Sequence, residues 1–189
     1  MRVIGAIIMF VILAVPVHAA PRAIDVAKSK ITLYVDKQGM FAFLADNHEI
    51  DAPLASGSYD AETKSVELTF EAAKLRVLDP KLSAGRRADV QANMLSPKVL
   101  DVEQYPKIEF HSTKIVETDA SHWTVTGDLT LHGKTQPLNV SVVQSDPSHF
   151  TGSATVRQTA FGIVPIKVGG GTVAVKDDIR VTFDVAVTP

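Results

Sequence analysis

The sequence contains no cysteine among its 189 residues. Such a chain forms no disulfide and offers no thiolate to zinc, to an iron–sulfur cluster or to a nucleophilic mechanism. It also lacks an excess of charge of one sign, because 19 Lys and Arg residues stand against 21 Asp and Glu residues, for a net charge of −2. A basic excess would indicate nucleic acid as a partner, and an acidic or low-complexity chain would indicate disorder. These absences exclude nucleic acid as a predicted partner and leave a globular domain.

The longest apolar run lies at the N-terminus, where Arg2 precedes an almost uninterrupted apolar stretch over residues 3–17. A helix of that length rises about 22 Å at about 1.5 Å per residue, which is less than the roughly 30 Å core of a bilayer. The pattern is therefore typical of a secretory signal, and Val17-His18-Ala19 suits cleavage after Ala19. We predict a signal peptide over residues 1–19, one mature domain over residues 20–189, and a periplasmic or secreted location.

Alternation of apolar and polar residues dominates the mature chain. This period of two is typical of strands with one buried and one wetted face. Short turn signals such as His132-Gly133-Lys134 separate the runs, which indicates an antiparallel meander. The alternation, with a weaker run over 48–59, covers residues 31–36, 48–59, 66–72, 108–111, 123–131, 138–142, 150–157 and 179–187. We predict an all-β fold of eight antiparallel strands that closes into a barrel, since closure removes the sheet edges.

One stretch around residues 83–105 departs from this alternation. Its apolar residues have helical spacing, and Ser83 can cap the start of a helix. Pro97 ends a first helical piece, and a second short piece is predicted around residues 99–104, before Pro106. We expect this helical excursion to cover one mouth of the barrel.

The polar residues provide little evidence for catalysis. None of the histidines of the mature chain forms an H-x-H or H-x-x-x-H pair of the kind that binds a metal. Asp46-Asn47-His48 is the nearest polar cluster, in which a carboxylate and an imidazole can orient each other. The G-x-S-x-G element of many serine hydrolases is missing. We therefore predict no metal site, no catalytic residue and no enzymatic activity.

Small residues occur at positions that share the phase of the large apolar ones: Ala52, Ala72, Gly127, Gly152 and Ala154. They would leave room along the barrel axis unless large neighbours fill it. An eight-stranded barrel is just wide enough to be filled by its side chains or to hold one small ligand. The pattern alone therefore leaves open whether the interior is hollow or filled.

Four segments carry a resemblance to a known family. Residues 105–112 include Pro106-Lys107-Ile108-Glu109-Phe110-His111-Ser112, similar to "P-x-I-x-F-x-S". Residues 125–135 resemble "V-x-G-x-L-T-x-H-G-x-T", residues 161–163 read "F-G-I", and residues 175–179 are similar to "V-x-D-x-V". In this order, over roughly residues 23–188, these segments resemble the YceI-like family.

The resemblance implies a lipocalin-like eight-stranded barrel, export to the periplasm and, as in some family members, a polyisoprenoid chain in the lumen. It implies no cofactor other than such a bound molecule, an isoprenoid lipid or a quinone. Contact with a membrane would then be transient. Within the motif "L-T-x-H-G", we interpret His132 as a turn residue and not as a catalyst.

We accordingly predict an exported lipid-binding protein that stores or transports an apolar molecule. The residues expected to line the lumen are Leu33, Val35, Leu68, Phe70, Phe110, Val125, Leu129, Val140, Val156, Val181 and Phe183. One alternative is a structural or stress-related periplasmic protein whose barrel is filled and binds nothing. Another is an enzyme on a lipidic substrate that uses His48 or Arg157 near a mouth.

Overall fold

The computed structural model describes residues 20–39 and 47–188. The signal peptide expected over residues 1–19 lies outside the described residues, so the signal and its cleavage after Ala19 stay predictions. In the part that is described, the chain is mostly β-sheet, as expected.

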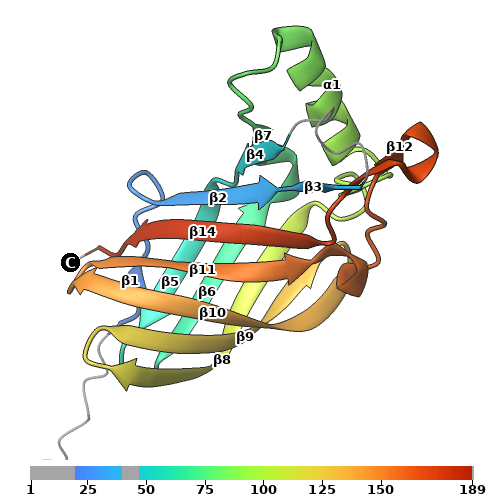
Figure 1. Ribbon diagram of the computed structural model, residues 1–189. Helices are drawn as coiled ribbons and strands as arrows, with labels where there is room; N and C mark the ends of the chain where they lie inside the picture. The colour runs from blue at the N-terminus through green and yellow to red at the C-terminus, as the bar shows by residue number, and fades with distance from the viewer. Residues whose placement is uncertain (1–19, 40–46, 189) are drawn as a thin grey trace, which may run out of the picture.

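Eleven strands form one antiparallel sheet in the order β1-β5-β6-β8-β9-β10-β11-β14-β2-β4-β7. Their bounds are Arg22–Ala23 (β1), Lys30–Val35 (β2), His48–Asp51 (β4), Leu54–Asp60 (β5), Ser65–Glu71 (β6), Arg76–Val77 (β7), Lys107–Asp119 (β8), His122–Leu131 (β9), Lys134–Asp146 (β10), His149–Arg157 (β11) and Asp178–Ala186 (β14). A second, small sheet consists of Lys37–Gln38 (β3), Lys167–Val168 (β12) and Val173–Val175 (β13). The large sheet curls so that β5 and β6 lie behind β14, β11 and β10 in Figure 1.

The predicted count of eight strands is wrong, although the all-β antiparallel class is confirmed. Two added strands, β1 and β7, have only two residues each. The third arises because the weak run over 48–59 divides at Ala52-Pro53 into β4 and β5. Proline has no N–H to donate to a neighbouring strand. Here the chain passes from β4, which pairs with β2, to β5, which pairs with β6 at the other side of the sheet.

The two sides of the curled sheet meet at one end through the segment that begins with β1. β1 pairs with β5, and the following Ile24 forms an isolated bridge with Val187, just after β14. The backbone N–H of Asp25 also donates to the carbonyl of Ala186 at 2.8 Å. The sheet therefore curls into a half-barrel that is joined by this segment at the end near the C-terminus (Figure 1).

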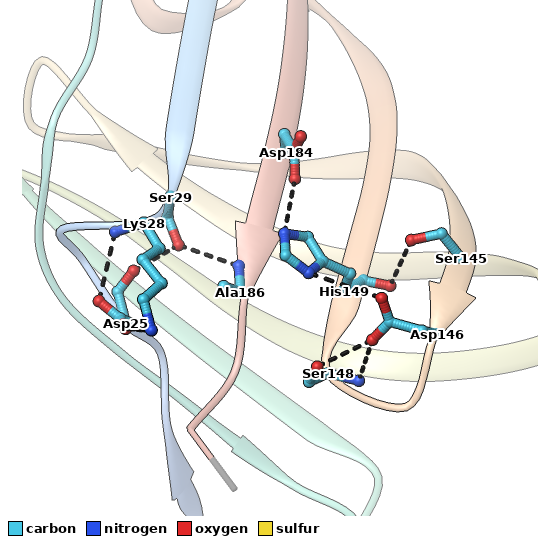
Figure 2. A network of polar contacts seen from close by, with 9 residues as sticks. All are labelled: Asp25, Lys28, Ser29, Ser145, Asp146, Ser148, His149, Asp184 and Ala186. Carbon is cyan, nitrogen blue, oxygen red and sulfur yellow. Dashed lines mark hydrogen bonds and ion pairs between the residues drawn. The ribbon is translucent and has the colours of Figure 1, made fainter.

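Side chains fasten the same end, as Figure 2 shows. The Ser29 hydroxyl donates to the Asp25 carbonyl at 2.7 Å and accepts from the Ala186 N–H at 3.1 Å. The Asp25 carboxylate also lies 3.2 Å from the Lys28 ammonium. These contacts tie the start of β2 to the end of β14.

A carboxylate in the turn between β10 and β11 provides a pH-dependent contribution to stability. The N–H and the hydroxyl of Ser148 both donate to Asp146 at 2.8 Å and hold its pKa below the ordinary value. A lowered pKa stabilises the fold above the unfolded value, near 4, and this stabilisation is lost as the pH falls through the folded value. Asp146→Ala should therefore lower the melting temperature at pH 7, by an amount that shrinks below about pH 4.

Thermal unfolding followed by circular dichroism from pH 7 to pH 3 measures this effect. Asp128→Ala is the matched control, because the Asp128 side chain is exposed on β9 and has no hydrogen bond or ion pair with any residue that the structure describes. A difference in melting temperature for Asp146→Ala that stays constant over the whole range would contradict the expectation.

The predicted helix is confirmed in its first part and wrong in its second. Helix α1 spans Ala84–Leu95, and the Ser83 hydroxyl accepts from the Arg86 N–H at 3.4 Å as its N-cap. Residues 97–104 form turns instead of a second helix. The N–H groups of Leu100 and Val102 donate to carbonyls in the last turn of α1, at 3.1 and 3.2 Å, which folds the chain back over the helix end.

One glutamine fastens α1 to the edge strand β7. The Gln91 side chain accepts from the Val77 N–H at 2.7 Å and donates to the Leu75 carbonyl at 2.8 Å. The helix therefore stands at one end of the large sheet, next to β4 and β7 (Figure 1). Among the residues that the structure describes, short 3₁₀ segments lie at Ala72–Lys74, Gln158–Phe161 and Gly169–Gly171. None of the helices in the described part of the chain is long and apolar enough to cross a membrane.

Candidate ligand-binding cavity

The inward face of the large sheet and α1 line a cavity of about 970 Å³ that is partly open to solvent. Ligand pockets in proteins have volumes of roughly 300–1,000 Å³, so this cavity is at the upper end of that range. Its wall consists mainly of aliphatic and aromatic side chains from both sides of the sheet. The interior is thus hollow, whereas the filled-barrel alternative would require side chains in this space.

All eleven residues expected from the alternation lie in the cavity wall: Leu33, Val35, Leu68, Phe70, Phe110, Val125, Leu129, Val140, Val156, Val181 and Phe183. Phe110, Val125 and Leu129 are buried, and the other eight are only partly buried although they point inward. Their remaining accessible surface faces the cavity. That these residues bind a ligand stays a prediction.

Gly127 and Gly152 do not add free space to the cavity, because an aromatic ring lies against each of them. A Cβ added at Gly127 would lie 2.4 Å from Cζ of Phe110, and one added at Gly152 would lie 2.4 Å from Cζ of Phe183. Each aromatic ring therefore lies against the sheet over a glycine. This packing of a ring over a strand glycine stabilises a sheet at a position that has no side chain of its own.

Of the three alanines in the inward phase, two line the cavity and one does not. Ala52 and Ala154 line the cavity, where their small side chains leave space. Ala72 does not line it and is buried, with 1% of its surface exposed. The hollow interior therefore owes part of its volume to Ala52 and Ala154.

Aromatic residues line the end of the cavity nearest the C-terminus, and the sequence analysis missed them. The rings of Tyr59 and Phe150 have centroids 5.9 Å apart, and those of Trp123 and Phe150 are 6.2 Å apart. All three residues lie in the wall. Trp123 and Phe150 begin the predicted runs over 123–131 and 150–157, in phase with Val125 and Gly152. The pattern therefore placed both side chains inward, although neither was among the predicted lining residues.

Helix α1 and the turns after it contribute to the opposite end of the wall. Val90, Met94 and Leu100 line the cavity there. The residues come from the segment that was expected to cover a mouth of the barrel. Helical spacing places Val90 and Met94 on one face of α1, toward the sheet.

His48 lies in the cavity wall, and its partner is not the one that local sequence suggests. Asp46 lies outside the described residues, and Nδ1 of His48 lies 2.6 Å from Oδ2 of Asp79. The other carboxylate oxygen of Asp79 accepts from the Glu49 N–H at 2.8 Å. Asp79 is 31 residues away along the chain, so no local pattern could reveal the pair. The inward position of His48 could have been found, because it alternates with Ile50.

Arg157 and His132 do not contribute to the cavity. Arg157 is exposed and pairs with Asp178 at 3.3 Å, so the proposed role of Arg157 at a mouth finds no support. His132 and Gly133 form the two-residue turn between β9 and β10, with φ of 51° and 70°. Two positive φ values are typical of a type I′ hairpin turn. The interpretation of His132 as a turn residue agrees with this geometry.

Metal ligands do not gather anywhere in residues 20–39 and 47–188, where no group of three or more His, Asp or Glu side chains could hold an ion. The cavity is mainly apolar, and the carboxylate–histidine pair of Asp79 and His48 places one imidazole in its wall. Such a space can take up an apolar chain and offer a polar group to one of its atoms.

Comparison with known families gives one match over most of the chain. The family described as "YceI-like domain" matches residues 23–187. A UPF0312 protein of Pseudomonas syringae pv. tomato is 29% identical over 170 residues, which covers 79% of this chain and 83% of the relative.

Solved structures show the same fold. The chain is similar to BcnA of Burkholderia cenocepacia, with a TM-score of 0.61, 20% identity and coverage of 87% of this chain and 99% of that one. It is also similar to a structure described as a polyisoprenoid binding domain from Saccharophagus degradans, implicated in plant cell wall breakdown. That match has a TM-score of 0.61 and 10% identity, and it covers 87% of this chain and 96% of that one. At sequence identities of 20% and 10%, the similarity to these two structures shows a shared fold alone.

Proposed function

The chain belongs to the YceI-like domain family, and from this premise we propose that it is an exported protein that holds one apolar molecule of polyisoprenoid type in its cavity. The bound molecule would be an isoprenoid lipid or a quinone, and the protein would store or carry it. The proposed role is binding and not catalysis.

The single observation that carries this proposal is the apolar cavity of about 970 Å³. Transfer of each CH₂ group from water into such a space contributes about 0.8 kcal/mol before the cost of ordering the chain. A long apolar chain therefore gains most of its binding energy from the wall alone. The structural neighbour from Saccharophagus degradans, described as a polyisoprenoid binding domain, supports the choice of ligand class.

Two further features support export and transient contact with a membrane. The positively charged, apolar segment over residues 1–19 has the composition of a secretory signal. Ile166 lines the cavity and is 38% exposed, and the neighbouring Val164 is 71% exposed. Exposed apolar side chains beside a cavity can contact the lipid surface from which an apolar ligand is taken.

Extraction of the protein purified from its native cells tests the proposal. We expect organic solvent to release an apolar lipid that mass spectrometry identifies, and the intact mass of the same protein should correspond to a chain that begins at Ala20. Protein that yields no lipid on repeated extraction, and that takes up no added isoprenoid, would contradict lumen binding. A mass that retains residues 1–19 would contradict export by this signal.

A further inference from the structure

The carboxylate–histidine pair of Asp79 and His48 places a polar imidazole in the mainly apolar wall of the cavity. His48 lies on β4 in the same inward phase as Ile50, and both residues line the cavity. The side chain of His48 is 22% exposed, whereas that of Asp79 is 3% exposed. The imidazole therefore stands between the cavity and a carboxylate that is shielded from water.

The hydrogen bonds of Asp79 determine which nitrogen of His48 carries the proton. Oδ1 of Asp79 accepts from the Glu49 N–H, and Oδ2 lies 2.6 Å from Nδ1 of His48. A carboxylate that accepts from both neighbours requires a hydrogen on Nδ1, so the neutral imidazole has its free electron pair on Nε2. Nε2 has no hydrogen bond with any residue in the described part of the chain.

The backbone holds Asp79 firmly in this position. Its φ of 21° lies in a region that favours glycine, and its carbonyl accepts from the Leu82 N–H at 3.0 Å and from the Arg87 guanidinium at 3.4 Å. An unfavourable backbone conformation persists where surrounding contacts enforce it, and such residues are frequent at functional sites.

We propose that Nε2 of His48 accepts a hydrogen bond from a hydroxyl group at the polar end of the ligand, so that the protein prefers isoprenoid alcohols to isoprenoid ketones. Asp79 acts as a positioning residue because it sets the tautomer. This inference rests on the proposed function and adds to it the chemical class of the ligand's polar group. A ketone has no hydrogen to donate and would leave Nε2 unpaired in an apolar wall.

Two ligands with one carbon skeleton test the preference, namely farnesylacetone and the secondary alcohol obtained by its reduction. We expect the delipidated wild-type protein to bind both and to bind the alcohol about three- to tenfold more tightly, as one added hydrogen bond predicts. Equal affinities would overturn the inference and leave the proposed function intact. Failure to bind either ligand would overturn the proposed function as well.

Two variants separate the role of each residue. His48→Phe keeps an aromatic ring but removes both ring nitrogens, and it should reduce the ratio of the alcohol affinity to the ketone affinity to about one. Asp79→Asn keeps an acceptor for Glu49 and places an N–H₂ group at Nδ1, which moves the imidazole proton to Nε2. Nε2 then donates a hydrogen bond, which the oxygen of a ketone can accept. The ratio of the alcohol affinity to the ketone affinity should therefore fall to about one, or below one in favour of the ketone.

His111→Phe is the matched control, because His111 has a side chain that is 55% exposed and does not line the cavity. This variant should keep the preference of the wild type. A full preference for the alcohol in folded Asp79→Asn or in His48→Phe would overturn the inference. Circular dichroism establishes that each variant is folded, and loss of the preference in both variants supports the inference.

Discussion

Replacement of Ala154 by phenylalanine is expected to weaken the binding of an isoprenoid ligand at least about tenfold while the protein stays folded. Ala154 lies on β11 between Val140 on β10 and Val181 on β14, and all three residues line the cavity. A ring attached here enters the hollow interior. If it displaces only two CH₂ groups of the ligand, the loss is about 1.6 kcal/mol, which is more than tenfold in affinity.

Thr155→Phe is the control for this experiment, since Thr155 is the next residue and is exposed on the outer face of β11. Both variants add a phenyl ring to the same strand, but only one ring enters the cavity. Titration of the delipidated proteins with farnesol, followed by calorimetry, gives the affinities. Equal affinities for the two variants would show that the ligand binds elsewhere than in this cavity.

Gly152→Ala is expected to destabilise the protein by about 1–3 kcal/mol, the usual range for an overpacked interior. A Cβ at this position would lie 2.0 Å from the backbone oxygen of Ser141 on β10 and 2.4 Å from the ring of Phe183 on β14. The ring can turn aside only into the cavity, and the backbone oxygen can move only with its strand. We expect the upper part of the range because β10, β11 and β14 would all have to shift.

Urea unfolding measures this change in the free energy of unfolding, and Gly85→Ala is the matched control. Gly85 lies in α1, and a Cβ there would have no atom within 4 Å. In a helix alanine is favoured over glycine by up to about 1 kcal/mol. The same substitution should therefore be neutral or stabilising at residue 85 and destabilising at residue 152. Equal stability of the two variants would contradict the close packing of β10, β11 and β14.

The inward face of the sheet could be predicted because a strand has a period of exactly two residues along its length. Once the phase of one strand was assigned, every second residue lay on the same face, and all eleven expected lining residues are in the cavity wall. The same rule placed Trp123 in the inward phase of β9, although Trp123 was not among the predicted lining residues. The omission concerned the choice of residues within the pattern and not the pattern itself.

Strand boundaries could not be obtained from the pattern with the same accuracy. Residues 48–59 were predicted as one strand. In the structure they form β4 and β5, which lie at opposite sides of the curled sheet. The division at Pro53 depends on which strands each half pairs with, and pairing is a contact between residues far apart in the chain. The second helical piece could not be judged from the sequence for the same reason. The N–H groups of Leu100 and Val102 donate to carbonyls at the end of α1, so they are not available for the hydrogen bonds of a second helix.

The amino-acid sequence by itself determined the class of the fold, its inward face and its family, because alternation and short motifs are local properties of a chain. Only the tertiary structure decided whether the interior was filled or hollow, since the same phase of small and large residues permits both. It also brought His48 to Asp79 across 31 residues. Closure of a curled sheet sets the distance between its inward faces, and that distance depends on all of the strands together.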